Sequence, residues 1–424
     1  MEKRALMQPV NPVLPETGFA VDRLLAPGQA IVTFLSRVRP PRPQTESVAL
    51  DGAHGRILAE PIAADADYPS TMRSLMDGFA LRARATPGTF QRVDGVRMGD
   101  ASHQAIAEGS AAAIPTGGVL PKDADAVVPI EEVRVDGNSV IVRGRIAPGE
   151  NVAERGADMR RGETILPASR RIRAAEIGVL ATLGVSAVPV YRRPVIAVFS
   201  SGDELIDPSE RPRLGQIRDS NRYVVAASLQ AMGARPRHYP TLPDEAREFE
   251  AALDAALREC DAVVVTGGSS VGERDRLPRA VTAIADPGIV VHGIRVKPGK
   301  PTLFAAHAGK PIIGLPGNPT SALMMLEAVC TPIVAALTGG RVDSPTIDAR
   351  LAEPLRSRAG WTWYVPVRLQ GEGSMPDAHP LALRSFSVSL TARSDGYVIM
   401  HENDEEWFSG KSVTVHRYLE GCAT

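Results

Sequence analysis

Two rigid turns within residues 291–320 constrain the fold of this chain more than any other feature. The first holds Lys297 and Lys300 in the sequence Lys-Pro-Gly-Lys-Pro, between two strand-like runs. The second, Leu-Pro-Gly-Asn-Pro at 315–319, opens an apolar helix. Proline holds φ near about −65° and glycine reaches backbone angles closed to other residues, so both turns are preformed. Two neighbouring ammonium groups repel each other unless an anion separates them. The first turn is therefore predicted to bind phosphate or another small oxyanion; the alternative is a pair of tight turns with solvated lysines.

Two apolar, strand-like runs upstream end in small and acidic residues. The run at 195–199 is followed by Ser-Ser-Gly-Asp-Glu-Leu, which contains Glu204. The run at 262–265 is followed by Thr-Gly-Gly-Ser-Ser-Val-Gly-Glu-Arg-Asp, which ends at Asp275. Small residues at a strand's carboxyl end let backbone N–H groups approach a phosphate, and carboxylates there can hold a hydrated cation. Because open α/β sheets bind ligands at this edge, the loops predict a site for a phosphate with a divalent metal.

Composition indicates an ordinary globular protein with several domains. The chain has 424 residues, of which 44% are hydrophobic and 23% charged, and this length exceeds what one core usually supports. Aromatic residues make up 4% and the net charge is −1, which argues against nucleic-acid binding. No signal peptide is evident, prolines interrupt the apolar stretch at 310–341, and three scattered cysteines form no paired motif. We therefore expect a cytoplasmic protein without a membrane-spanning segment.

The pattern of apolar residues predicts a multidomain α/β protein. Strands alternate with helices after residue 194, whereas short β-prone pieces separated by Gly, Pro and Asp precede residue 161. We expect a flexible lead (1–24), a scaffold domain (25–64 with 162–193), an inserted small β-rich domain (65–161), a three-layer α/β domain (194–340) and a C-terminal β-rich domain (341–424).

Several motifs, in this order and spacing, resemble those of the molybdopterin molybdenumtransferases. They are Ser-Ser-Gly-Asp-Glu-Leu at 200–205, Gly-Gln-Ile-Arg-Asp-Ser-Asn at 215–221, the Thr-Gly-Gly-Ser-Ser run at 266–275 and the two turns at 297–301 and 314–319. The family includes the bacterial molybdenum-insertion enzymes and the E domain of gephyrin. In the N-terminal half, Ser-Leu-Met-Asp-Gly-Phe-Ala at 74–80 and Thr-Gly-Gly-Val-Leu-Pro at 116–121 look like family motifs. The resemblance covers nearly the whole chain from about Leu25 onward.

The resemblance implies an enzyme of molybdenum cofactor biosynthesis. Adenylylated molybdopterin and molybdate would yield the molybdenum-bearing cofactor and AMP, with Mg²⁺ as the metal and residues 194–340 as the molybdopterin-binding domain. The reaction must bring a dianion to an anionic pyrophosphate, so lysines and a divalent cation would neutralise charge. The resemblance also implies an elongated homodimer of four-domain subunits. Further candidate partners are the molybdopterin adenylyltransferase and apo-molybdoenzymes.

The resemblance also carries functional residues over to matching positions of this chain. Glu204 and Asp275 match the family's acidic residues at two strand ends and are expected to be catalytic and to hold the metal. Asp77, Thr116 and Asp158 are expected to be catalytic as well, with Asp77 reaching the partner subunit's site, although each could instead shape a turn. The expected ligand-binding residues are Gly267, Gly268, Ser269, Lys297, Lys300, Pro301, Asn318 and Ser321.

Three segments depart from the family pattern. Ala153 occupies the arginine position of the family's Asn-x-Arg-x-x-Gly-x-Asp segment, and Arg155, two residues on, is a candidate substitute. Met72-Arg73 replaces the polar Asp-Asn pair that commonly precedes Ser74. Trp361 stands where the family's Arg-Pro-Glu-Phe segment has an arginine thought to help hold molybdate. These changes leave open a second function class, a non-catalytic molybdopterin-binding paralogue acting as carrier, scaffold or regulator.

Overall fold

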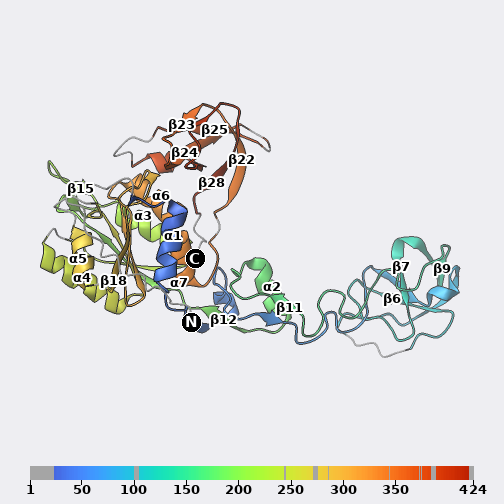
Figure 1. Cartoon of the computed structure of the whole chain (residues 1–424). Coiled ribbons are helices and arrows are strands. Elements are labelled where there is room, and N and C mark those ends of the chain that lie inside the picture. The colour runs from blue at the N-terminus through green and yellow to red at the C-terminus, as the bar shows by residue number, and fades with distance from the viewer. Residues whose placement is uncertain are drawn as a thin grey trace, which may run out of the picture. The chain divides into compact units, whose positions relative to one another are not determined.

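The computed structural model describes residues 23–99, 105–242, 245–270, 276–284, 286–342, 344–371, 373, 375–382 and 388–419. Most of the expected flexible lead lies outside these residues, and so does Asp275. The chain divides into two compact units (Figure 1). Unit 1 consists of Met1–Ala59, Ser169–Ile177 and Ala187–Thr424, and unit 2 of Glu60–Ala168 and Gly178–Ser186. The finer division into scaffold, inserted, α/β and C-terminal domains stays a prediction.

A mixed six-stranded sheet forms the centre of unit 1. Its strands, in spatial order, are β16 (Arg235–His238), β13 (Val195–Ser200), β17 (Ala262–Thr266), β21 (Lys310–Leu315), β20 (Leu303–His307) and β18 (Pro287–His292). The first four are parallel, and β20 and β18 add an antiparallel edge. The central strands are continuous apolar runs because both faces of the sheet are covered.

Two layers of helices cover this sheet, as Figure 1 shows. On one face lie α1 (Pro27–Arg37), α3 (Asn221–Ala231), α6 (Pro319–Ala328) and α7 (Thr331–Thr338); on the other lie α4 (Ala246–Glu259) and α5 (Arg276–Ile284). Alternation along β13 decides the faces: Ile196 and Val198 join the first core, whereas Ala197 and Phe199 join the second. The predicted three-layer α/β architecture is confirmed.

The C-terminal part of unit 1 is a closed β structure. Its main strands are β22 (Thr346–Leu351), β24 (Thr362–Gln370), β25 (Asp377–Pro380), β26 (Gly396–Met400) and β28 (Ser412–Arg417). They follow the order β24-β25-β22-β28-β26, and β26 pairs again with β24, which closes the ring. The short strand β19 (Val296–Lys297) pairs with β24 in parallel and joins this β structure to the Lys-Pro-Gly-Lys-Pro turn. The smaller elements here are β23 (Leu355–Arg356), β27 (Glu406–Trp407) and α8 (Leu390–Arg393).

Unit 2 is built on a second six-stranded sheet. Its order is β7 (Ala126–Pro129), β4 (Gly78–Leu81), β6 (Ser110–Ile114), β5 (Gly88–Val93), β9 (Ser139–Val142) and β8 (Val133–Asp136). Phe79, Phe90 and Val140 pack in its core. Two small antiparallel pairs accompany the sheet, β3 (Arg73–Ser74) with β10 (Val152–Ala153) and β2 (Ile62–Ala63) with β11 (Thr164–Leu166). The β-rich character expected for this part of the chain is confirmed.

The remaining elements are β1 (Thr45–Ala49), β12 (Ala187–Tyr191), β14 (Leu205–Ile206), β15 (Ile217–Arg218) and α2 (Ala174–Thr182), with single turns η2 (Leu50–Gly52), η3 (Ala83–Ala85) and η4 (Ile130–Glu132). In the described part of the chain, no single helix is long and apolar enough to cross a membrane. Helices α6 and α7 taken together meet the length and composition of a membrane span, but the chain bends by 55° between them.

Candidate active site

The carboxyl ends of β13, β17 and β21 meet at one edge of the unit 1 sheet. The strand register pairs Ser200 with Thr266 and Thr266 with Leu315. Gly267 follows with a φ of +82°, and a Cβ atom there would lie 2.6 Å from the carbonyl oxygen of Ser201. Gly268 also has a positive φ, +61°. These two glycines are therefore required by a close approach of two loops at the predicted phosphate edge.

Buried hydrogen bonds fix the loops at this edge. The Ser269 hydroxyl donates to the carbonyl oxygen of Leu315 at 3.1 Å, and the Asn221 side-chain amide donates to that of Gly317 at 2.8 Å. Ser269, predicted to bind ligand, thus uses its hydroxyl hydrogen within the protein. The Gly267 N–H is engaged as well, by the Leu315 carbonyl oxygen at 3.1 Å, so a ligand would meet the other backbone N–H groups of this loop and the hydroxyl lone pairs.

A short polar chain beneath the edge connects two of the strands. The Thr266 hydroxyl lies 3.2 Å from that of Ser200, and Ser200 donates to the buried Asp219 carboxylate at 2.9 Å. Arg222 approaches the same carboxylate at 3.5 Å. Sequence reasoning did not single out Asp219 or Asn221 as site residues, although both lie in the Gly-Gln-Ile-Arg-Asp-Ser-Asn motif. Their membership of that motif was the available signal.

Helix α6 begins at this edge. Asn318 is its N-cap, and the Asn318 side-chain oxygen accepts from the Ser321 backbone N–H at 3.1 Å and the Ser321 hydroxyl at 3.2 Å. Pro319 occupies the first turn, where its missing N–H costs no helical hydrogen bond. The predicted residues Asn318 and Ser321 are thus brought together at a helix N-terminus, whose backbone donors favour an anion.

The Lys-Pro-Gly-Lys-Pro turn packs against the same helix. Gly299 has a φ of +111°, and a Cβ atom there would overlap the side chain of Met325 in α6. Thr302 fixes the turn from inside by donating its hydroxyl to the Gly299 carbonyl at 2.7 Å. Lys297 and Lys300 are exposed on the outside of the turn. Helix α6 therefore carries both rigid turns, one at its N-terminus and one against its side.

The tail segment that departs from the family pattern lies against this turn. The Lys297 ammonium nitrogen lies 3.8 Å from the centre of the Trp363 ring, in the pairing of β19 with β24. Trp361, at the expected arginine position, has the guanidinium carbon of Arg358 5.4 Å from its ring centre. This segment therefore lacks the expected arginine, and its two tryptophan rings instead contact a lysine and an arginine from neighbouring positions.

Glu204 follows β13 and its side chain is exposed. A Cβ atom at Gly202 would lie 2.6 Å from each Glu204 carboxylate oxygen, so this carboxylate folds back over the glycine. Within the described residues, no hydrogen bond or ion pair occupies the Glu204 carboxylate, and no cluster of three or more metal-binding side chains is present. Mg²⁺ is commonly held by one or two carboxylates together with substrate phosphates, so this oxygen donor fits it. The second expected ligand, Asp275, lies outside the described residues.

Unit 2 brings two further predicted residues into contact. The Asp77 carboxylate accepts from the Thr116 backbone N–H at 2.6 Å and from the Thr116 hydroxyl at 2.9 Å. These hydrogen bonds, the backbone one first, hold the Asp77 pKa below its usual range. Asp158 is exposed on a loop whose backbone bonds to Tyr68, and no described hydrogen bond joins it to this pair.

Comparison with known proteins places these features in one family. Three family models match the chain: the MoeA N-terminal region (domain I and II) over residues 25–184, the probable molybdopterin binding domain over 197–336 and the MoeA C-terminal region (domain IV) over 348–418. A molybdopterin molybdenumtransferase of Bacillus subtilis is 31% identical over 385 residues, covering 88% of this chain and 89% of that protein. One of Haemophilus influenzae is 33% identical, covering 88% and 94%. The crystal structure of the molybdopterin biosynthesis moeA protein from Pyrococcus horikoshii OT3 has a TM-score of 0.82 at 26% identity, covering 93% of this chain and all of that one.

Proposed function

The chain belongs to the molybdopterin molybdenumtransferase family, and we propose that it converts adenylylated molybdopterin and molybdate into molybdenum cofactor and AMP, with Mg²⁺. It is a transferase of molybdenum cofactor biosynthesis. No finding on the structure or the relatives favours the non-catalytic alternative. The observation that carries the proposed reaction is the pair of preformed turns on α6, beside the glycine-rich edge of the sheet.

The proposed substrate contacts follow from the charges at this edge. The backbone N–H groups of Gly268 and of the start of α6 would receive phosphate oxygens, because they present donors without side chains in the way. Gly267, whose N–H donates to the Leu315 carbonyl oxygen at 3.1 Å, would shape this loop. Lys297 and Lys300, with Pro301 setting the turn, would hold the molybdate dianion by charge-assisted hydrogen bonds. The Ser321 hydroxyl lies in the first turn of α6, at the helix N-terminus that would receive the phosphate oxygens.

The metal requirement rests on the acidic side chains. Glu204 and Asp275 would hold Mg²⁺, which when bound offsets the negative charge of the pyrophosphate oxygens. Glu204 can reach over Gly202 because that residue has no side chain. Asp77 stays ionised through its two bonds from Thr116 and would accept a hydrogen bond from substrate or water.

We propose a homodimer in which Asp77 of one copy completes the site of the other. Supporting this, exposed apolar side chains precede Asp77 in the sequence of unit 2: Leu75 is 54% exposed, Met76 41% and Met72 45%. Contiguous exposed apolar side chains commonly mark an interface. We place the protein in the cytoplasm, since the thiols of Cys260 and Cys330 are free, as is usual in a reducing compartment.

Formation of active cofactor tests the proposed function. Purified protein is incubated with adenylylated molybdopterin, Mg²⁺ and molybdate, and the product is transferred to an apo-molybdoenzyme whose activity is measured. We expect activity that requires both molybdate and the protein. Equal activity without the protein, or none with it, would contradict the proposal.

A further inference from the structure

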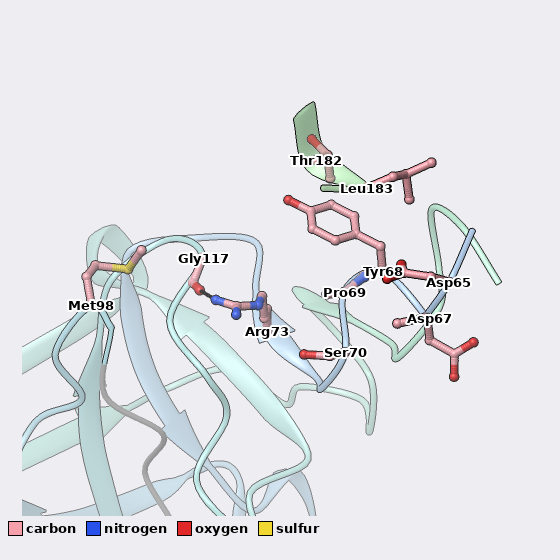
Figure 2. Close-up of a pocket in the computed structure, with 11 residues that line it drawn as sticks. Asp65, Asp67, Tyr68, Pro69, Ser70, Arg73, Met98, Gly117, Thr182 and Leu183 are labelled. Atoms are coloured by element: carbon pink, nitrogen blue, oxygen red, sulfur yellow. Dashed lines mark hydrogen bonds between the residues drawn. The ribbon is translucent and has the colours of Figure 1, made fainter. Parts of the chain in front are cut away.

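A pocket of about 470 Å³ in unit 2 contains one cationic side chain, Arg73 (Figure 2). Tyr68, Met98 and Gly117 are among its other lining residues. The Arg73 guanidinium donates from Nη1 to the carbonyl oxygen of Gly117 at 2.6 Å, which Figure 2 shows as a dashed line. Among the described residues this is the one hydrogen bond of the Arg73 side chain, so the other guanidinium N–H groups are left for a ligand.

The charge of Arg73 is not neutralised by the described residues. None of their carboxylates forms an ion pair with it. Asp67, which also lines the pocket, is bound to the Arg155 guanidinium at 2.7 Å and to the Arg161 backbone N–H at 2.9 Å. In Figure 2 the Asp67 carboxylate points away from Arg73. A half-buried arginine without a carboxylate partner is suited to binding an anion.

The strand register explains why an arginine stands at position 73. In the antiparallel pairing of β3 with β10, Arg73 lies directly opposite Ala153. Facing residues of such a pair project from one side of the ribbon, with Cβ atoms about 4.5–5.5 Å apart. Ala153 stands at the arginine position of the family's Asn-x-Arg-x-x-Gly-x-Asp segment, which this part of the sequence resembles. The side chain of an arginine at 73 therefore leaves the backbone close to the point from which an arginine at 153 would.

Arg155 is the other substitute that the sequence offers, and the structure disfavours it. Its side chain pairs with Asp67. Residues 153 and 155 are two apart, but only 153 faces Arg73 in the ladder. Like charges directly opposite each other destabilise a strand pair, so an arginine at 73 is compatible with a small neutral residue at 153.

The predicted catalytic pair of unit 2 lies on the same turn. Thr116 binds Asp77 with its N–H and hydroxyl, and the next residue, Gly117, binds Arg73 with its carbonyl. Arg73 and Asp77 are thus attached to consecutive residues. A ligand bound by this guanidinium would therefore lie close to the turn that carries Thr116 and Gly117.

We propose that Arg73 replaces the arginine missing at position 153 and binds an anionic phosphate group of the pterin substrate. The inference rests on the proposed function for the identity of the ligand. It goes further in assigning the phosphate contact to Arg73 rather than Arg155. It also explains the two departures from the family pattern at 73 and 153 together, because the arginine has moved from one strand of the pair to the other.

The replacement of an arginine at 153 by Arg73 is tested by moving the arginine from position 73 to position 153, its partner in the pairing of β3 with β10. Arg73→Asn should raise the KM for adenylylated molybdopterin about ten- to a hundred-fold, the range of a charge-assisted hydrogen bond, with a smaller effect on kcat. The double variant Arg73→Asn/Ala153→Arg should return KM to within about threefold of wild type. Arg134→Asn, which removes an exposed arginine from β8 of the same unit, is the control and should leave KM unchanged.

Equilibrium binding of adenylylated molybdopterin by the same four proteins separates this inference from the proposed function. If wild type binds the compound without releasing AMP, the reaction is wrong, and the Kd values still decide the role of Arg73. Wild-type Kd and KM in Arg73→Asn would overturn the inference. So would a loss that Ala153→Arg does not restore in a double variant whose circular dichroism and thermal melting match those of wild type. Failure of wild type to bind the compound would overturn both proposals.

Discussion

The ammonium group of Lys297 lies over the Trp363 ring, 3.8 Å from its centre, and the two residues are partners in the pairing of β19 with β24. A lysine on an exposed turn otherwise samples many rotamers, which weakens any anion site that it forms. Cation–π attraction of about 0.5–1 kcal/mol at exposed sites, and ~2 kcal/mol when desolvated, restrains it. Trp363 belongs to the tail segment that departs from the family pattern. This departure therefore restrains Lys297, one of the two lysines of the proposed molybdate clamp formed by Lys297 and Lys300.

Replacing Trp363 by leucine should raise the KM for molybdate about two- to thirty-fold, because Lys297 loses its cation–π contact. Trp363→Phe should have an intermediate effect, since a smaller ring remains. The measurement is molybdate titration of AMP release. Phe408→Leu is a matched control, because Phe408 is 69% exposed in the same unit. An unchanged molybdate KM in Trp363→Leu would show that the ring does not support the clamp.

Lys300→Met should weaken molybdate binding by about ten- to a hundred-fold, because it keeps the length of the side chain but removes one charge-assisted donor. AMP release at saturating molybdate should recover at least partly, since the lost interaction is one of binding. Lys411→Met, which removes a lysine stacked on Trp407, is the control. Molybdate titrations of wild type and Lys300→Met that superimpose would exclude the turn as the molybdate site.

Thr116→Val should raise the pKa of Asp77. The Thr116 backbone N–H and hydroxyl both lower this pKa by binding the charged form, and the variant removes only the hydroxyl, so part of the depression remains. As pH falls, the variant carboxylate should therefore become protonated earlier than the wild-type one. An NMR titration of the Asp77 carboxyl measures this, with Thr89→Val as a control in β5. The same Asp77 pKa in Thr116→Val and wild type would mean that the hydroxyl bond does not persist in solution.

Local sequence patterns were sufficient for the layers of unit 1. Periods of apolar residues located α3 and α4, and continuous apolar runs located β13, β17 and β21. The apolar runs at 363–365, 397–399 and 413–415 likewise predict strands, and they lie in β24, β26 and β28. Such patterns report which residues face a core, and burial by neighbouring layers dominates that choice.

Pairing between distant segments could not be read from the same patterns. The apolar run predicts one strand over 289–296, but β18 ends at His292 and a separate β19 begins at Val296. The chain leaves the sheet at Gly293, whose N–H bonds to Thr302 across the lysine turn. The facing of Arg73 and Ala153 and the contact of Asp77 with Thr116 likewise join residues remote in sequence. Local periodicity shows which side of an element faces the core, whereas strand register also depends on the pairing partner, which the local pattern does not identify.

Mixing two inactive variants tests the shared site. Asp77→Ala and Glu204→Ala homodimers should each be inactive, but hybrid dimers would hold one site with both residues intact. Random exchange should restore about a quarter of wild-type activity, because half of the dimers are hybrid and each has one intact site. Subunit exchange is confirmed by differently tagged chains. Hybrid dimers without activity would argue that Asp77 acts within its own subunit, or not at all.

The most direct test of the central claim is molybdate-dependent AMP release from adenylylated molybdopterin, measured for wild type, Glu204→Ala and Glu210→Ala. Glu204, which follows β13, has a carboxylate without a hydrogen bond or ion pair to the described residues, whereas Glu210 is exposed further along the chain. We predict AMP release by wild type and Glu210→Ala, and none by Glu204→Ala, which should still bind the pterin within about tenfold of wild type, or ~1.4 kcal/mol. Full AMP release by Glu204→Ala would remove this carboxylate from the mechanism, and the absence of molybdate-dependent AMP release by wild type would contradict the proposed reaction.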